Sequence, residues 1–378
     1  MSEADLAGAH EGAHAGGAGA RRHGLGIVGA GVIAETHAAA VATIPGAALV
    51  AVTDLVPDQA KGFAQAHDCE AEPDLGALLA REDIDVVSVC VPSGRHAEVG
   101  SQVAAAGKHL IVEKPIDVTL EAADRLIEAA RAAGVVMTVI SQHRFDPGLI
   151  ELRRLLGAGA LGRLVLGDAS TKWYRSQAYY DSADWRGTWA LDGGSLMNQG
   201  IHYVDLLRWC MGPVAEVSAM CATQAHEMEA EDVALAVLRF ASGAVGTIAA
   251  STDVFPGFAQ RLEISGTDGT VVVEDGEIVH RAFRGQVPDP GLRGTRDGLG
   301  AAVPATGADA AALATASHAA QIADLLAAVD QGREPSVTAA DGRAALEVIL
   351  AVYQSAREGR TVAPAAPGSP GLAGAGAR

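Results

Sequence analysis

The amino-acid sequence predicts an α/β protein with a parallel sheet in its first third, and three observations support this fold class. Apolar strand-like runs alternate with helical stretches between residues 25 and 141, which is typical of β-α-β units. The run at 85–92 is apolar on both faces, as expected for a central strand covered by helices on each side. Beyond residue 160, strand-like runs follow one another with short turns between them, which predicts a second domain with its own sheet.

The elements of the first domain follow one another in a regular order. Strands are predicted at residues 25–28, 48–53, 85–92, 109–115 and 135–141. Helices are predicted between them at residues 32–44, 57–67, 95–106 and 120–133. Strands that are joined through helices form right-handed crossovers, so these strands are expected to pair in parallel.

The second half reads as a meander of strands that closes on a helix. Strand-like runs occupy residues 162–175, 215–225, 231–240, 244–254, 260–275 and 276–283. Short turns such as Ser242-Gly243 and Asp268-Gly269 separate some of them. An amphipathic stretch at 340–359 predicts a final helix. A sheet of this kind covers one face with helices and must bury the other elsewhere, so we expect oligomers.

Composition excludes several classes of partner. The formal net charge of -18 and the isoelectric point near 5.0 argue against nucleic acid and anionic membranes, which are polyanions. No apolar run approaches a membrane span, and the first residues lack the pattern of a secretory signal. The Gly- and Ala-rich ends at 1–22 and 361–378 are predicted to be disordered tails. We therefore expect a cytoplasmic protein that binds neither membrane nor nucleic acid.

The four cysteines are scattered, with no Cys-x-x-Cys pair and no closely spaced His/Cys cluster. This distribution argues against a zinc or iron–sulfur site and is consistent with a reducing compartment. The sequence therefore predicts no metal.

A glycine motif directly follows the first predicted strand. Gly29 permits a tight turn, Gly31 lets the backbone approach a pyrophosphate, and Ala34 is small enough for helix–strand packing. The helix that starts here attracts phosphates through its N-terminus. Asp54, at the end of the next strand, is expected to accept hydrogen bonds from the adenosine ribose hydroxyls. Leu55 and Val56 offer no basic side chain for a 2′-phosphate, so NAD is favoured over NADP.

Further candidate residues follow the other strands, because ligands of such sheets lie beyond the carboxyl ends of the strands. In the loop 91–96, Pro92 and Ser93 are expected to line the cofactor, whereas His96 either contacts it or simply starts a helix. The full set of predicted cofactor-binding residues is Gly29, Gly31, Val32, Ile33, Asp54, Val91, Pro92, Ser93, His96, Glu113, Lys114, Gln142, Trp185 and Arg186.

Five segments resemble the Gfo/Idh/MocA family of oxidoreductases, also called the glucose–fructose oxidoreductase or inositol dehydrogenase family. They are GIVGAGVIAETH, VPSGRHAEV, AGKHLIVEKPIDVT, QHRFDPG and GGSLMNQGIHYVDLLRW. The resemblance implies an N-terminal Rossmann domain and a C-terminal α/β domain with a large, open, mostly antiparallel sheet. We place these domains at 23–142 and 143–360. It also implies a homodimer or homotetramer.

The resemblance places the catalytic lysine on Lys114. A solvated surface lysine would be unusual there, since a buried strand precedes it and Pro115 fixes the turn. Glu113 either orients Lys114 or serves as a structural hydrogen-bonding group. Asn198 and His202 lie at positions i and i+4 of a predicted helix, hence on one face.

Much of the family has aspartate where this chain has Asn198, and an amide cannot accept a proton as that carboxylate could. His202 remains as the general base, because the pKa of histidine suits proton transfer near neutral pH. The alternative is a core histidine satisfied by Asp205, which is itself expected to be structural.

The segment 171–194 concentrates tryptophans, tyrosines and arginines. Aromatic faces and guanidinium groups suit sugar rings and acidic substituents, although a structural loop or a subunit contact would also account for the segment. The resemblance puts Trp185 and Arg186 near the cofactor and the neighbouring subunit. The predicted substrate-binding residues are Lys114, Arg144, Tyr174, Arg175, Tyr179, Tyr180, Asn198 and His202, and Arg144 could serve either ligand.

Together these features predict an NAD-dependent oxidoreductase that transfers a hydride between a ring alcohol of a sugar, sugar derivative or cyclitol and nicotinamide. Within enzymes, the alternative is an NADH- or NADPH-dependent reductase of keto-sugars of the anhydrofructose type. A nucleotide-binding regulator without catalysis is a second alternative, and retention of both Lys114 and His202 argues against it. A glycosidase that uses NAD transiently is a third.

Overall fold

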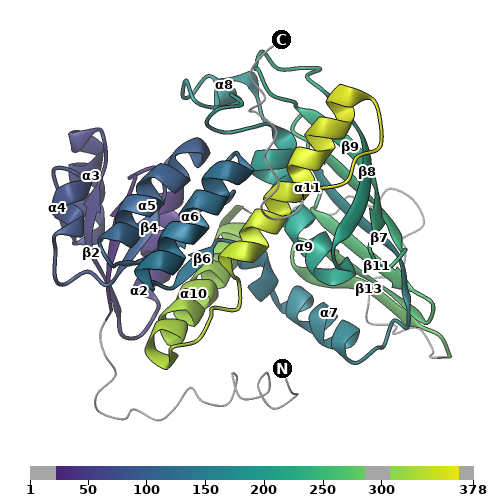
Figure 1. The fold of residues 1–378 in the computed structure, drawn as a ribbon, viewed down its shortest axis with the longest axis horizontal. Helices are drawn as coiled ribbons and strands as arrows, with labels where there is room; N and C mark the ends of the chain where they lie inside the picture. Colours follow the sequence, from purple (N-terminus) through teal and green to yellow (C-terminus); the bar gives the residue numbers. More distant parts are fainter. Residues whose placement is uncertain (1–22, 286–306, 366–378) are drawn as a thin grey trace.

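The computed structural model describes residues 23–285 and 307–365. The predicted tail at 1–22, and residues 366–378 of the other predicted tail, lie outside these ranges. Two sheets stand at opposite sides of the molecule, with helices packed between and around them (Figure 1). The predicted α/β class with two sheets is confirmed.

The first sheet is parallel throughout and has the strand order β3-β2-β1-β4-β5-β6. Its strands are β1 (His23–Val28), β2 (Ala47–Thr53), β3 (Glu70–Ala71), β4 (Val86–Val89), β5 (His109–Val112) and β6 (Met137–Val139). The last three strands are shorter than predicted, because their final residues leave the sheet and form the loops of the candidate site. The strand order reverses beside β1, where ligands of such sheets bind.

Helices cover both faces of this sheet. They are α2 (Val32–Ala42), α3 (Pro57–His67), α4 (Leu75–Leu79), α5 (His96–Ala105) and α6 (Leu120–Ala133). Leu126 of α6 packs with Val87 and Val112 in the core on one face. On the other face α2 is joined by α10 (Gly307–Gln331), a helix that the sequence analysis did not predict. The chain thus returns to the first sheet after it has built the second (Figure 1).

The second sheet has the strand order β13-β12-β11-β7-β10-β9-β8, and only β7 and β10 pair in parallel. Its strands are β7 (Leu164–Lys172), β8 (Val214–Ala222), β9 (Val233–Phe240), β10 (Val245–Ser251), β11 (Arg261–Gly266), β12 (Gly269–Glu274) and β13 (Glu277–Phe283). Along β9 buried and exposed residues alternate, with Leu238 on the core side and Val237 on the outer side. The predicted meander is therefore confirmed as a mostly antiparallel sheet.

Three helices cover the inner face of the second sheet: α7 (Pro147–Gly157), α9 (Ile201–Met211) and the predicted final helix, α11 (Ala339–Glu358). Helix α11 runs across the middle of the molecule and also packs against α6 (Figure 1). One continuous apolar core therefore joins the two sheets, including Leu126, Leu207 and Leu346. None of the described helices combines the length and the apolar character needed to cross a bilayer.

Candidate active site

The cradle for a dinucleotide starts at the turn between β1 and α2. Gly29 has a φ of 94°, and a β-carbon there would lie 2.6 Å from the carbonyl oxygen of Cys90, so only glycine fits. Gly31 caps α2 without a side-chain hydrogen bond, and nothing lies within 4 Å of the place of its missing side chain. The helix N-terminus therefore faces open space, as phosphate binding requires.

The acidic end of this cradle is Asp54. One carboxylate oxygen accepts from the backbone N–H of Ala30 and the other from that of Val56, each at 2.8 Å. These bonds hold the carboxylate beside the glycine turn, and each oxygen keeps a lone pair for a ribose hydroxyl. The neighbouring Leu55 is 97 % exposed and Val32 is 82 % exposed. Exposed apolar side chains beside a phosphate-binding turn suit packing against an adenine ring, so the residues present fit NAD.

Lys114 lies where β5 ends, next to a buried carboxylate. Glu113 accepts from the backbone N–H of Lys114 at 3.1 Å and from Nε2 of His37 at 2.8 Å. His318 of α10 lies 3.9 Å from the same carboxylate. Burial would raise the pKa of Glu113, but His37, His318 and Lys114 lower it to about 2. Glu113 is therefore a fixed negative charge directly behind the lysine.

The ammonium of Lys114 points away from Glu113 and toward the segment that precedes α9. Its Nζ donates to the backbone oxygen of Asn198 at 2.9 Å and to the side-chain oxygen of Asn198 at 3.2 Å. Burial lowers the pKa of Lys114, and the nearby Arg175 and Arg186 lower it further, whereas Glu113 and Asp192 oppose this shift. An ammonium in such surroundings gives up its proton more readily than a free lysine does.

His202 lies on the same small cavity as Lys114. Burial lowers the pKa of His202 well below its ordinary value, and Lys114, His143 and His318 add to the shift. The ring is therefore neutral at neutral pH and ready to accept a proton. Asp205, considered above as its partner, instead binds Arg144. The geometry thus places a donor and a neutral base side by side.

His143 is a neighbour of His202 that the sequence analysis did not single out. The two rings meet edge to face with centroids 5.1 Å apart. Nδ1 of His143 lies 2.7 Å from the carboxylate of Asp146, which is buried and also accepts from Ser317 at 2.5 Å. His143 directly follows Gln142 in a predicted site loop, but nothing in the sequence indicated that its ring would face α9.

Three of the remaining predicted cofactor residues, His96, Ser93 and Gln142, follow the ends of β4 and β6. His96 is buried, and its ring nitrogens lie 2.6 Å from the oxygen of Pro115 and 2.9 Å from that of Val91, so it ties two site loops together. Ser93 and Gln142 are buried at the ends of β4 and β6. The side-chain oxygen of Gln142 has no hydrogen-bond partner among the described residues, which leaves it available to a ligand.

The aromatic segment divides into a group that stacks around Tyr179 and residues that do not join this group. The guanidinium of Arg186 stacks on Tyr179 and Trp185 at 4.3 and 4.5 Å, and that of Arg175 lies 5.2 Å from the centroid of Tyr179. Tyr180 is instead buried and shares a 2.7 Å hydrogen bond with the hydroxyl of Thr252.

Tyr174 points away from this group. It packs edge to face on Phe255 and pairs through its backbone with Asp253 at the end of the second sheet. Arg175, Tyr179 and Arg186 therefore remain the best placed of the aromatic segment to meet a substrate.

Arg144, predicted to touch a ligand, is occupied within the protein. Its Nε donates to Asp205 at 2.8 Å and its Nη2 donates to the other oxygen at 2.5 Å. Nη2 also lies 3.3 Å from Asp341, in the first turn of α11. The two side chains of the main pair are 4 % and 3 % exposed. This bidentate pair joins η2 (Gln142–Phe145) to α9, which favours a structural role for Arg144.

Replacing Arg144 by methionine should therefore destabilise the fold. The substitution leaves the buried carboxylate of Asp205 without its partner, and such losses cost about 3–5 kcal/mol. Urea unfolding should show this loss. The matched change Arg154→Met, at an exposed pair with Glu151, should cost at most about 1 kcal/mol. Unchanged stability combined with a raised KM would instead assign Arg144 to a ligand.

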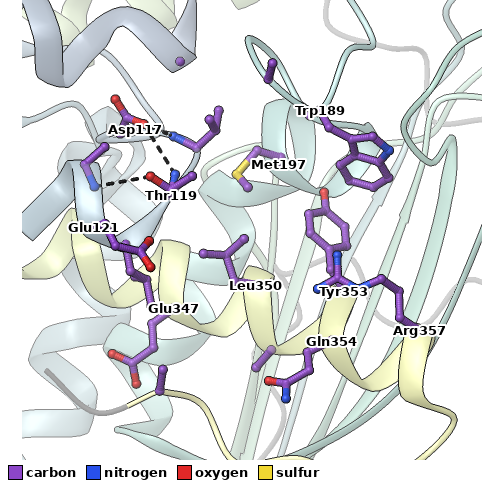
Figure 2. Close-up of a pocket in the computed structure, with 18 of the residues that line it drawn as sticks. Asp117, Thr119, Glu121, Trp189, Met197, Glu347, Leu350, Tyr353, Gln354 and Arg357 are labelled. Carbon is purple, nitrogen blue, oxygen red and sulfur yellow. Dashed lines mark hydrogen bonds between the residues drawn. The ribbon is translucent and has the colours of Figure 1, made fainter. Parts of the chain in front are cut away.

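A separate cavity of about 670 Å³ is lined by α6, by α11 and by the loop that carries Trp189; Figure 2 shows its lining side chains. Trp189, Met197 and Tyr353 line it together with residues of α6 and α11. Neither Lys114 nor His202 is among its lining residues, so the candidate catalytic groups lie on a different cavity.

Comparisons with known proteins agree with this architecture. Residues 24–141 match the oxidoreductase family with an NAD-binding Rossmann fold, and residues 149–272 match the GFO/IDH/MocA C-terminal domain. The chain is 30% identical over 256 residues to the uncharacterized oxidoreductase YrbE of Bacillus subtilis, covering 66% of this chain and 73% of that protein. It is 29% identical over 344 residues to inositol 2-dehydrogenase of Rhizobium meliloti, covering 89% and 98%.

A solved structure gives the same result. The WlbA dehydrogenase from Bordetella pertussis, in complex with NADH and UDP-GlcNAcA, superposes with a TM-score of 0.80 at 31% identity, covering 91% of this chain and 98% of that one. The match spans both sheets, so the predicted family resemblance is confirmed. This chain belongs to the GFO/IDH/MocA family of oxidoreductases.

Proposed function

We propose that this protein is an NAD-dependent dehydrogenase that oxidises a ring secondary alcohol of a sugar, sugar derivative or cyclitol. The observation that carries the proposal is the pairing of Lys114 and His202 on one cavity, beside the carboxyl ends of β5 and β6. The relatives support it, since one is an inositol 2-dehydrogenase and another holds NADH together with a sugar nucleotide.

The proposed reaction divides its work between the two side chains. Bound NAD⁺ supplies the hydride acceptor at C4 of its nicotinamide. His202, neutral at neutral pH, takes the hydroxyl proton of the substrate. Lys114 donates a hydrogen bond to the same oxygen and stabilises the negative charge that develops as the hydride leaves. Glu113 and Asn198 hold Lys114 in place from its two ends.

The groups around Lys114 favour a polar, acidic or phosphorylated substrate. Arg175 and Arg186 both lie close enough to Lys114 to lower its pKa, and both stack on Tyr179. Nε of Arg175 has no hydrogen-bond partner among the described residues. Guanidinium groups recognise carboxylates and phosphates, and an aromatic face suits the apolar side of a sugar ring. We propose these three residues as the substrate-binding group.

The test of the proposed function is NADH formation from NAD⁺ with a panel of cyclitols, free pyranoses, uronic acids and UDP-sugars, followed by the absorbance of NADH. The proposal predicts turnover with one substrate class. Turnover only in the reverse direction, from keto-sugars and NADH, would identify a keto-sugar reductase. Tight NAD binding without turnover in either direction would support the non-catalytic regulator.

Cofactor choice gives a separate prediction at Asp54. Replacing Asp54 by alanine should raise the KM for NAD⁺ about 10- to 100-fold, because a charged hydrogen bond to the ribose is lost. The kcat/KM for NADP⁺ should change little or rise, since a repulsive carboxylate disappears. The exposed Asp58→Ala serves as the matched control. If the ratio of kcat/KM for NAD⁺ to kcat/KM for NADP⁺ stayed unchanged, Asp54 would not contact the ribose.

We also propose that the outer face of the second sheet packs against another copy of this chain. Met220, Leu235 and Val237 are exposed there by 78%, 52% and 59%. Exposed apolar side chains that gather on adjacent strands are typical of a subunit interface. Sedimentation equilibrium should then give a dimer or a tetramer.

The four unpaired cysteines support a cytoplasmic location, which fluorescence microscopy of a tagged chain would test.

A further inference from the structure

A carboxylate that the sequence analysis did not consider lies directly behind Asn198. Asp192 is 1% exposed, and one of its oxygens accepts a short hydrogen bond from the side-chain nitrogen of Asn198. Its other oxygen accepts from the backbone N–H of Gly187 at 2.8 Å. Asn198 in turn accepts from the ammonium of Lys114. A continuous chain of hydrogen bonds therefore runs from Asp192 through Asn198 to Lys114.

The carboxylate fixes which way the amide of Asn198 points. An ionised carboxylate only accepts hydrogen bonds, so Asp192 binds the NH₂ group of Asn198 and never its oxygen. The amide oxygen is thereby turned toward Nζ of Lys114, which only donates. Without Asp192 the amide could rotate by half a turn, and its NH₂ group would then face the ammonium.

The backbone holds Asp192 in this orientation. The N–H groups of Asp192 and Gly193 both donate to the oxygen of Thr188, at 3.1 and 2.8 Å. The same loop packs on η1 (Ser93–Arg95), where the N–H of Gly94 donates to the oxygen of Leu191 at 3.2 Å. Asp192 therefore stands on a tight turn that is anchored to the dinucleotide domain, and not on a free loop.

Charge gives Asp192 a second effect on Lys114. Two cations, Arg175 and Arg186, act on the ammonium of Lys114, and Asp192 and Glu113 are the acids that oppose them. Burial raises the pKa of Asp192 above its ordinary value, and the bond from Gly187, the charge of Lys114 and the bond from Asn198 act against this shift. These three groups therefore stabilise the ionised carboxylate against the cost of its burial.

We propose that Asp192 is the positioning residue of the active site, which acts on Lys114 through Asn198 by fixing the amide orientation and by favouring the charged lysine. This inference rests on the proposed function for its kinetic consequences. It assigns to an amide–carboxylate pair, Asn198 with Asp192, the task of holding the hydrogen-bond donor that meets the substrate oxygen. Asp192 itself touches neither substrate nor cofactor in this assignment.

The first test is Asp192→Asn, which keeps size and removes charge. The backbone N–H of Gly187 donates to the oxygen of the introduced amide, so the NH₂ group of that amide faces Asn198. Asn198 must then turn its own NH₂ group toward Lys114. We expect kcat to fall about 10- to 100-fold, the scale of a charge-assisted hydrogen bond, with an unchanged KM for NAD⁺. The exposed Asp184→Asn, in the same loop, should behave as wild type.

The most decisive experiment exchanges the side chains of Asp192 and Asn198. In the double variant Asp192→Asn with Asn198→Asp, the introduced carboxylate accepts from both the introduced amide and Lys114, so the chain of hydrogen bonds is restored. We expect the double variant to recover most of the activity lost in Asp192→Asn. In Asn198→Asp alone, two carboxylates meet and must share a proton, so activity should fall as the pH rises.

A measurement that needs no substrate tests the role of Asp192 separately from the proposed function. The pH dependence of Lys114 labelling by trinitrobenzenesulfonate, followed by mass spectrometry, reports the pKa of the ammonium. Loss of a nearby carboxylate should move this profile to lower pH in Asp192→Asn. A wild-type labelling profile in that variant would overturn the inference, as would a double variant no more active than the single one. A wild type without turnover would instead count against the proposed function alone.

Discussion

Replacing Lys114 by alanine should slow turnover severely while leaving NAD binding intact. The ammonium is a hydrogen-bond donor that lines the same small cavity as His202. A donor to a developing negative charge, or an acid–base group, contributes about 10²- to 10⁴-fold to the rate. We therefore expect kcat to fall by about 10³-fold, with the dissociation constant for NADH changed less than about threefold. Stopped-flow reduction of NAD⁺ and fluorescence titration with NADH measure the two quantities.

The control for this result is Lys61→Ala, at an exposed lysine of α3 that pairs with Asp58. Its kcat should equal that of wild type. If Lys114→Ala kept at least a tenth of the wild-type kcat, the lysine would not be the group that holds the substrate oxygen. The same loss in both variants would indicate a general effect of removing a lysine.

Replacing His202 by glutamine should lower kcat about 10²- to 10⁴-fold, because the neutral ring is the proposed proton acceptor. The pH profile gives the sharper reading. The pKa of His202 is held well below its ordinary value, so the wild-type oxidation rate should stay high as the pH falls through 6.5 and should decline only below it. His202→Gln should lose this acid limb of the profile. The surface change His67→Gln is the matched control.

Lys114 should set the opposite limb of the same profile. Burial and the neighbouring arginines lower its pKa from 10.5, so the charged donor is lost at a lower pH than for a free lysine. The oxidation rate should therefore decline on the alkaline side before pH 10.5. If the pH profile of His202→Gln matched that of wild type at acid pH, His202 would not be the proton acceptor.

The first domain was predictable because its signals are local. The glycine turn, the strand before it and Asp54 after the next strand follow one another closely in the sequence, and together they indicate a dinucleotide-binding β-α-β unit. Helix α10 lacks such a signal. Its alanine-rich sequence is apolar around much of its circumference, so no helical periodicity stands out. Only the folded chain shows that it returns to α2.

The candidate site was predictable only in part, since several of its contacts join residues that are far apart in the sequence. Lys114 and His202 each follow a recognisable pattern, whereas Arg144 gave no sign that Asp205 would occupy its guanidinium. Asp192 stands before two glycines and therefore resembles an ordinary turn residue. Its role depends on the distance to Asn198, which the fold alone determines.

The most direct test of the account follows a deuterium label. A substrate identified in the panel, deuterated at its ring carbons, is oxidised with NAD⁺, and the NADH formed is analysed by mass spectrometry. Direct hydride transfer predicts one deuterium in the nicotinamide for each turnover, together with a slowed rate in the deuterated substrate. Reduced cofactor without label, or label released into water, would contradict the proposed hydride transfer beside Lys114 and His202.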